Sequence, residues 1–237
     1  MIEHRLDLAR IRAITIDLDD TLWPVWPTIE RAEQALRTWL DAHAPGAAAL
    51  ARDADTARRA RQQTLARYPD RTHDLGHVRR EAIRQLLVWS GEPTHLAEPA
   101  FDVFLAERQR VTLFDDALPA LTRLGARYPL VALSNGNADV YRVGLGEHFH
   151  AAVSAAQVGV GKPDARIFLA GAQAAGADNA AVLHIGDDAH LDGAGGLVAG
   201  MQVAWINRRD EAWPPAIEGS PHAVTGELLA LCDLLGV

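Results

Sequence analysis

Three carboxylates follow a short apolar segment near the beginning of the chain. Residues 13–16 are typical of a buried β-strand, and Asp17, Asp19 and Asp20 come directly after it. Residues two apart on a strand point the same way, so Asp17 and Asp19 can address one point at the carboxyl edge of a sheet, where open α/β sheets bind ligands. Two carboxylates at one point repel each other unless a cation or a proton joins them. The pattern indicates metal or acid–base chemistry, and its alternative is a solvated acidic turn.

Two later apolar segments also end in residues suited to phosphate or metal binding. Residues 131–133 lead into small polar residues, and residues 181–185 lead into a second acidic cluster. The candidate residues are Ser134, Asn135 and Gly136 after the first segment, and Asp187, Asp188 and Asp192 after the second. Because the carboxyl ends of parallel strands share one edge of a sheet, we expect these groups to gather near Asp17.

A single lysine stands between these two segments. Of the 23 basic residues, 22 are arginine, and the one lysine is Lys162, within the segment Gly-Lys-Pro-Asp at 161–164. Lysine carries a compact charge on a flexible stem, whereas arginine carries a wide planar fork, so a cramped anionic site can require lysine. We therefore interpret Lys162 as a functional group rather than a chance surface charge.

Together these motifs resemble the haloacid dehalogenase-like (HAD) hydrolase superfamily. The matching motifs, in the family's order and with similar spacing, are Asp17-x-Asp19-x-Thr21, Ser134-Asn135, Lys162-Pro163 and Gly186-Asp187-x4-Asp192. The resemblance implies a phosphatase in which Asp17 is the nucleophile that forms an aspartyl-phosphate. Asp19 would be the general acid for the leaving oxygen and then the base that activates water. Lys162 would neutralise the nucleophile and the transferring group.

The resemblance also implies a magnesium ion. Asp17, Asp187 and the backbone carbonyl of Asp19 would hold it, since Mg²⁺ prefers six oxygen ligands, several of them waters. Asp188 would reach the metal through water, and Asp192 would orient the loop from outside the metal's own ligands. For Asp192, a capping or turn carboxylate is an equal alternative.

A phosphate and substrate pocket completes the implied site. Ser134 and the amides of Asn135 and Gly136 would bind phosphate oxygens near a helix N-terminus, with Thr21 as a further substrate-binding residue. A narrower resemblance, in residues 130–138, 144–146, 183–188 and 205–206, is to the bacterial YigB-type phosphatases. It implies FMN or the phosphorylated ribitylaminouracil of riboflavin synthesis as substrate. Trp23 could then stack on the flat ring.

Several other activities can be weighed against these residues. A phosphomutase, or a sugar or nucleotide phosphatase of the same superfamily, stays open. A phospho-acceptor receiver protein is a distant alternative because it has no large helical insert. A dehalogenase of the superfamily lacks the second aspartate of the first motif, which is present here as Asp19. A phosphonatase needs a cap lysine, and residues 23–111 contain none.

The segment between the first and second strands reads as helical throughout. Apolar residues at helical spacing predict helices over 28–43, 47–68, 73–90 and 94–111, with Pro45 and Gly46 as the first break. A crossover between strands rarely needs four helices. We therefore expect residues 23–111 to form an inserted C1-type cap, with crossover helices packed on the sheet as the alternative. This segment holds 13 arginines against 12 acidic residues, and the remainder carries the acidic excess.

After the insert, helices alternate with strands. The expected elements are helices 115–128, 137–145, 164–175, 191–199 and 224–235, strands 129–134, 150–154, 181–186 and 202–206, and a loop over 208–221. Short connections between such elements imply parallel strands with right-handed crossovers. We expect a doubly wound, Rossmann-like α/β core made of residues 1–22 and 112–237.

Composition limits the class of protein. The chain has 237 residues, 49% hydrophobic and 23% charged, which is ordinary for a soluble globular protein. A net charge of −8 argues against nucleic acid as a partner. Cys232 is the only cysteine, and no apolar segment is long enough to cross a membrane. We expect a cytoplasmic monomer or homodimer that acts on a small-molecule phosphate ester.

Overall fold

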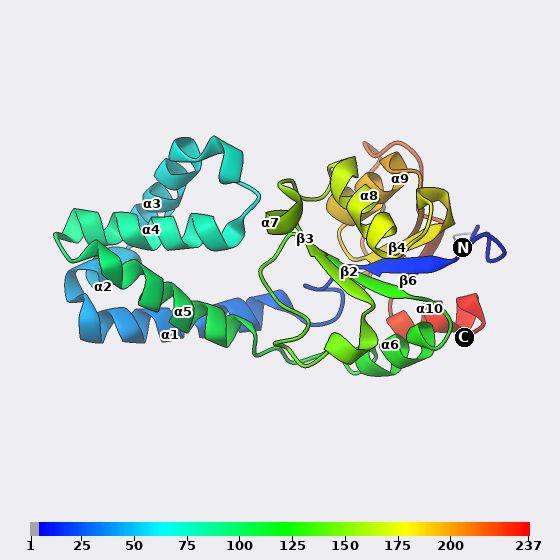
Figure 1. Ribbon diagram of the computed structural model, residues 1–237, viewed down its shortest axis with the longest axis horizontal. Helices are drawn as coiled ribbons and strands as arrows, with labels where there is room; N and C mark the ends of the chain where they lie inside the picture. The colour runs from blue at the N-terminus through cyan, green and yellow to red at the C-terminus, as the bar shows by residue number, and fades with distance from the viewer. Residues whose placement is uncertain (1–4) are drawn as a thin grey trace. The chain divides into compact units, whose positions relative to one another are not determined.

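The computed structural model describes residues 5–237 and contains a six-stranded parallel sheet (Figure 1). The strands are β1 (Ala13–Ile16), β2 (Leu130–Ser134), β3 (Ala151–Ser154), β4 (Val182–Gly186), β5 (Gln202–Ile206) and β6 (Ala223–Thr225), in the order β3-β2-β1-β4-β5-β6. The chain winds outward from β1 on one side and from β4 on the other, so the topological switch point lies between β1 and β4. Ligands bind outside the carboxyl ends of the strands at such a point. The first four residues of the predicted core lie outside the described residues.

Short apolar runs form the central strands because both faces of a parallel sheet are covered. Every residue of β1, β2, β4 and β5 is buried. Figure 1 shows α8 (Ala165–Ala174) and α9 (Gly195–Val198) on one face of the sheet, with α6 (Ala117–Gly125) and α10 (Leu228–Leu235) on the other. A short helix, α7 (Ala155–Val158), follows β3. The predicted doubly wound α/β fold is confirmed.

Two predictions for core elements are wrong. Residues 137–145 form turns rather than a helix, because the Asp139 carboxylate accepts a hydrogen bond from the backbone N–H of Tyr141 at 2.9 Å and Gly144 adopts a φ of +86°. Short polar side chains that bond their own backbone compete with helix formation in this way. The strand β6 was not expected, since three residues are too few to show a periodic pattern, and the last helix therefore begins at Leu228 instead of residue 224.

Contacts between residues divide the chain into two compact units, Met1–Pro24 with Thr112–Val237, and Val25–Val111. The second unit holds α1 (Val25–His43), α2 (Pro45–Arg52), α3 (Ala54–Arg67), α4 (Leu75–Ser90) and α5 (Ala97–Arg108). The prediction of a single helix over 47–68 is wrong, because the helix is divided at Asp53. The backbone of Asp53 is extended, and its carboxylate accepts a hydrogen bond from the Thr56 N–H and so caps α3. Pro45 begins α2 rather than only ending α1, as its fixed φ allows at the first position of a helix.

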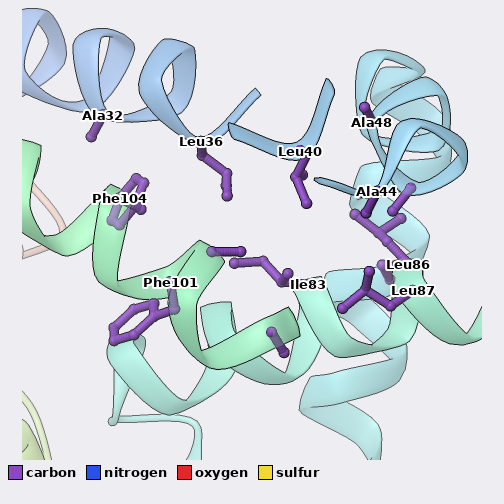
Figure 2. Close-up of a cluster of buried hydrophobic side chains, with 14 residues drawn as sticks. Ala32, Leu36, Leu40, Ala44, Ala48, Ile83, Leu86, Leu87, Phe101 and Phe104 are labelled. Atoms are coloured by element: carbon purple, nitrogen blue, oxygen red, sulfur yellow. The ribbon is translucent and has the colours of Figure 1, made fainter. Parts of the chain in front are cut away.

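The helical unit has a hydrophobic core of its own (Figure 2). Leu36 and Leu40 of α1 lie four residues apart and face Ile83 and Leu87 of α4, and Phe104 of α5 packs into the same cluster. Alanines of α1, α2 and α3 line the rest of it, which lets the helices approach closely. Among residues 5–237, none of the helices is long and apolar enough to span a membrane.

Candidate active site

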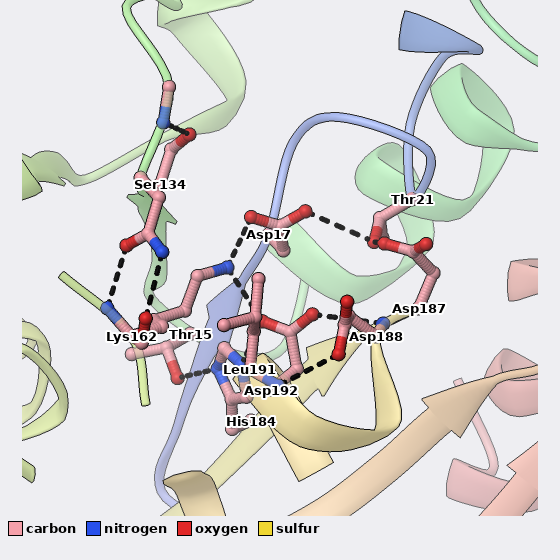
Figure 3. Close-up of polar contacts among 12 residues, drawn as sticks. Thr15, Asp17, Thr21, Ser134, Lys162, His184, Asp187, Asp188, Leu191 and Asp192 are labelled. Carbon is pink, nitrogen blue, oxygen red and sulfur yellow. Dashed lines mark hydrogen bonds and ion pairs between the residues drawn. The ribbon is translucent and has the colours of Figure 1, made fainter. Parts of the chain in front are cut away.

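The acidic residues after β1 and β4 meet at the switch point of the sheet (Figure 3). Asp17 extends the β1–β4 pairing, since its backbone N–H donates to the carbonyl of Ile185 at 2.9 Å. Oxygen atoms of Asp17, Asp187 and Asp192 all lie within 4.8 Å of one another. A group of three carboxylates this close can hold a divalent cation. Asp19, which the sequence placed among the metal residues, does not belong to this group through its side chain.

Lys162 lies at the centre of the acidic group. Its Nζ donates to Asp17 Oδ1 and, at 2.6 Å, to Asp192 Oδ1, and its side chain is only 3% exposed. Burial alone lowers the pKa of the ammonium, but the two carboxylates outweigh it and raise the pKa above its ordinary value. The lysine is therefore a fixed positive charge against Asp17.

The loop that carries Lys162 is held by Asn135. The Asn135 amide donates to the Lys162 carbonyl at 2.9 Å, and its oxygen accepts from the Lys162 N–H at 2.7 Å. Gly161 makes this possible, because a Cβ at that position would lie 2.7 Å from Asn135 Oδ1. The Asn135 side chain thus positions the lysine.

Asp192 is buried and receives three hydrogen bonds. Its Oδ1 accepts from Lys162 and from His184 Nε2 at 3.0 Å, and its Oδ2 accepts from the Asp188 N–H at 3.1 Å. Burial raises the pKa of Asp192, but Lys162 and His184 outweigh it and bring the pKa to about 2. The carboxyl group approaches the end of β4 because Gly186 has no side chain: a Cβ there would lie 2.2 Å from Asp192 Cγ.

His184 and Thr15 are two buried polar residues that the sequence interpretation did not single out. Thr15 Oγ1 and His184 Nδ1 are 2.9 Å apart, and neither residue is exposed to solvent. Burial lowers the pKa of His184 below its usual range, although Asp192 acts in the opposite direction. A signal was present, since a histidine in the middle of an otherwise apolar strand needs a buried partner.

Asp187 is held at the edge of the site by its neighbours. Thr21 Oγ1 donates to Asp187 Oδ1 at 3.1 Å, and Trp205 Nε1 donates to the Asp187 carbonyl at 2.7 Å. Burial, followed by the charges of Asp192 and Asp20, raises the pKa of Asp187 to about 7.

Burial also raises the pKa of Asp17, with Asp192 and Asp187 adding to the effect and Lys162 opposing it. Both Asp17 and Asp187 thus lie where a negative charge is unfavourable without a further cation, and their oxygens are the ligands that Mg²⁺ prefers. These residues therefore fit the magnesium ion that the sequence motifs imply.

The side chains of Asp19 and Trp23 contact each other. The Trp23 indole N–H donates to Asp19 Oδ1 at 2.8 Å, and the Trp23 side chain is fully buried. The burial of Trp23 does not favour the ring-stacking role expected for it from the sequence. Trp23 instead holds the Asp19 carboxylate in place.

The residues expected to bind phosphate lie at the end of β2. Ser134 is buried, and its Oγ accepts from the Gly136 N–H at 2.9 Å. The expected helix N-terminus behind them is absent, because residues 137–145 form turns.

Asp188, which was expected to reach the metal through water, caps the π-helical turn Ala189–Ala194. Its Oδ1 accepts hydrogen bonds from the N–H groups of His190 and Leu191.

Comparison with known proteins agrees with this geometry. A model of the haloacid dehalogenase-like hydrolase family matches residues 11–200. The chain is 30% identical over 236 residues to the 5-amino-6-(5-phospho-D-ribitylamino)uracil phosphatase YigB of Escherichia coli (strain K12), covering 96% of this chain and 98% of that protein. It is 30% identical over 159 residues to a phosphoserine phosphatase of Thermus thermophilus, covering 65% and 63%.

A solved structure is similar over nearly the whole chain. The crystal structure of a 2-haloacid dehalogenase from Pseudomonas syringae pv. tomato has a TM-score of 0.90 and 35% identity, and the match covers 95% of this chain and 98% of that one. The family model alone spans most of the chain, including all four motifs. This chain belongs to the haloacid dehalogenase-like hydrolase family.

Proposed function

We propose that the protein is a Mg²⁺-dependent phosphatase that hydrolyses a small-molecule phosphate monoester. The observation that carries the proposal is the group of buried Asp17, buried Lys162 and half-buried Asp187 at the switch point, where a carboxylate nucleophile has a fixed cation beside it. Uncatalysed hydrolysis of such esters is extremely slow, so an enzyme must supply a nucleophile, positive charge for the phosphoryl oxygens and a proton for the leaving group.

In the first step, an Asp17 oxygen attacks phosphorus and the bond to the leaving oxygen breaks. Asp19 gives its proton to that oxygen, and the indole N–H of Trp23 keeps the Asp19 carboxyl in place. Lys162 and Ser134 bind the oxygens of the transferring group. In the second step, Asp19 takes a proton from water, the water oxygen attacks phosphorus, and Asp17 leaves as a free carboxylate.

Asp17 and Asp187, together with the backbone carbonyl of Asp19, are the groups that would hold Mg²⁺. The ion would supply positive charge to the phosphoryl oxygens and lower the repulsion between the two carboxylates. Asp192 is less suited to it, since both of its oxygens already accept hydrogen bonds.

The helical unit, residues 23–111 in the sequence interpretation and Val25–Val111 by contacts, is proposed as the cap that selects the substrate. The YigB relative, aligned over nearly the full length of both chains, supports a flat heteroaromatic ring on a phosphorylated sugar-alcohol chain, as in FMN. With Trp23 buried, we propose Trp26 for such a ring, since at 66% exposed in α1 it is more exposed than Trp89 at 38%.

A second candidate is 2-haloacid dehalogenation, because the similar structure from Pseudomonas syringae carries that name. Asp19 favours the phosphatase, since a dehalogenase has no leaving oxygen that needs a proton. A phosphomutase would use the same groups but return the phosphoryl group to a sugar instead of to water.

One panel separates these activities. Purified protein is given FMN, sugar phosphates, nucleotides, phosphoserine and 2-chloropropionate, and phosphate and chloride release are measured with Mg²⁺ and with EDTA. Phosphate release that EDTA stops supports the proposal. Chloride release without phosphate release would replace the phosphatase with a dehalogenase, and full phosphate release in EDTA would remove the metal.

A further inference from the structure

A chain of buried polar side chains continues from the active-site lysine into the sheet (Figure 3). Lys162 Nζ binds Asp192 Oδ1 at 2.6 Å, the same oxygen lies 3.0 Å from His184 Nε2, and His184 Nδ1 lies 2.9 Å from Thr15 Oγ1. Thr15 is in the middle of β1 and His184 in the middle of β4, and both are fully buried. They do not reach the substrate, and none of the steps proposed above uses them.

The chemistry of Asp192 fixes the direction of these hydrogen bonds. An ionised carboxylate can only accept, so His184 Nε2 carries the hydrogen. The same Oδ1 atom already binds the ammonium of Lys162, and a second full positive charge beside it would be repelled. The ring is therefore neutral, its Nδ1 holds a lone pair, and the Thr15 hydroxyl donates to it.

The imidazole of His184 packs against Phe168 and Gly196. The ring of Phe168 meets it edge-on, with centroids 4.9 Å apart and planes at 87°. Gly196 lies against its other side, since a Cβ there would be 3.6 Å from His184 Cδ2. These contacts enclose the ring, and the Asp192 carboxylate, which can only accept, sets its tautomer and leaves the Nδ1 lone pair to the Thr15 hydroxyl.

We propose that Thr15 and His184 are positioning residues of the active site. The Thr15 hydroxyl donates to the buried Nδ1 lone pair and so stabilises the Nε2–H tautomer of His184 that Asp192 requires, and that N–H holds Asp192 so that its Oδ1 keeps Lys162 against Asp17. In the other tautomer a lone pair on Nε2 would face Asp192 Oδ1, and the carboxylate would turn away and draw the ammonium with it. The catalytic part of the inference rests on the proposed function of Lys162 and Asp17.

Two matched variants test the role of the hydroxyl. Thr15→Val replaces it with a methyl group of nearly the same shape, and Thr15→Ser keeps it. Partners outside the reacting groups typically change activity by about 10- to 100-fold, so kcat should fall by at least about tenfold in Thr15→Val. KM should stay close to the wild-type value, and Thr15→Ser should retain most of kcat. His184→Gln, which keeps an N–H donor, should be more active than His184→Leu.

Spectroscopy gives a readout that does not depend on turnover. Lys162 is the only lysine, so protein labelled with ¹⁵N- and ¹³C-lysine gives one side-chain signal from this site. ¹⁵N-histidine shifts should show the Nε2–H tautomer for His184 in the wild type and in Thr15→Ser. In Thr15→Val, the unprotonated Nδ1 loses its hydrogen-bond donor, so both its ¹⁵N shift and the lysine signal should change.

Several results would overturn the inference. An Nδ1–H or imidazolium form of His184 in the wild-type protein does so directly, even if Thr15→Val fails to fold. A Thr15→Val protein that matches Thr15→Ser in kcat and in the lysine signal does so as well. Loss of kcat in Thr15→Val with unchanged Nδ1 and lysine signals would show a merely structural role. A wild type that releases no phosphate would remove the proposed function, while the nitrogen and lysine signals would still decide the hydrogen-bond chain.

Discussion

Asp17 is the residue on which the proposed chemistry depends most directly. Asp17→Asn is nearly isosteric and leaves Lys162 paired with Asp192, so the fold should survive while the nucleophile is lost. We expect phosphate release to fall by several orders of magnitude with little change in melting temperature. Asp164→Asn is the matched control, because that carboxylate binds Arg166 outside the acidic group. Wild-type turnover in Asp17→Asn would show that another group attacks phosphorus.

Lys162 tests the need for a compact charge. Its side chain is enclosed between Asp17 and Asp192, and Lys162→Arg keeps the charge but puts a wider head in the same space. We expect kcat to fall at least about tenfold, since a misplaced charge at a tight site is costly. The measurement is phosphate release at saturating substrate. An arginine variant with unchanged kcat would mean that charge alone is required.

The burial of Lys162 also predicts its reactivity. Only 3% of the side chain is exposed, and the two carboxylates keep the amine protonated by raising its pKa. An acylating reagent should leave Lys162 unmodified in the native protein and modify it after denaturation. Peptide mass spectrometry measures both states. Rapid acylation of Lys162 in native protein would contradict the enclosed ion pair.

At the scale of single elements, two helices of the helical unit, α3 and α4, are capped by the aspartates Asp53 and Asp74. Asp74 begins α4, where its carboxylate accepts from the His77 N–H at 2.8 Å and from Arg71 at 2.7 Å. Replacing such a cap by alanine typically costs about 1 kcal/mol of stability. Urea unfolding of Asp74→Ala should show a loss of this size, and Asp74→Asn, which also caps, should lose much less. Equal losses in the two variants would argue against the cap.

The same contact gives a pH dependence with a definite sign. Burial raises the pKa of Asp74, but the hydrogen bonds from His77 and Arg71 outweigh it, so the pKa is lower in the folded than in the unfolded chain. The ionised cap therefore stabilises the fold above the unfolded pKa of about 3.9, and this stability is lost as pH falls through the folded pKa. The stability difference between wild type and Asp74→Asn should therefore shrink as pH falls below about 3.9. A stability difference that does not change with pH would show that ionisation of Asp74 does not contribute to the stability of the fold.

The elements of the core could be predicted where hydrophobic patterning was strong. β1, β2, β4 and β5 are mostly apolar, and each lies within two residues of its predicted limits. The prediction of a helix over 137–145 was wrong because the Asp139 side chain forms a local turn. The spacing of apolar residues does not reveal such a turn. β6 exists only through its pairing with β5, a contact between segments that no local pattern contains.

At the scale of the whole molecule, the choice of substrate is proposed to belong to the helical unit. Trp26 is 66% exposed at the start of α1, and a ring stacked on it should gain about 1 kcal/mol beyond its area burial, or roughly five- to tenfold in affinity. Trp26→Ala should lower kcat/KM for FMN more than for a small sugar phosphate, because the phosphate-binding groups are untouched. Trp89→Ala, near the end of α4, is the control.

The ratio of the two kcat/KM values is the measurement for Trp26. An unchanged ratio would remove the stacking role from this residue. A wild-type enzyme that prefers the small sugar phosphate would remove the flat-ring substrate itself, whatever Trp26 does.

The sequence alone was enough to predict the family. It also predicted which strands end in polar residues and which charged residues gather there. It could do so because parallel strands bring their carboxyl ends to one edge, so that residues directly after Ile16 and Gly186 must lie together. The one lysine of the chain could be assigned in the same way, from its type and its motif.

Tertiary structure decided the partners of those groups. Only packing shows that Trp23 is buried against Asp19, that Asn135 holds the loop of Lys162, and that the end of β4 leaves room for Asp192. The pairing of Thr15 with His184 joins residues 169 positions apart, through strands that are neighbours only in the folded sheet. Such contacts depend on burial and on the directions of individual side chains, which neither composition nor periodicity specifies.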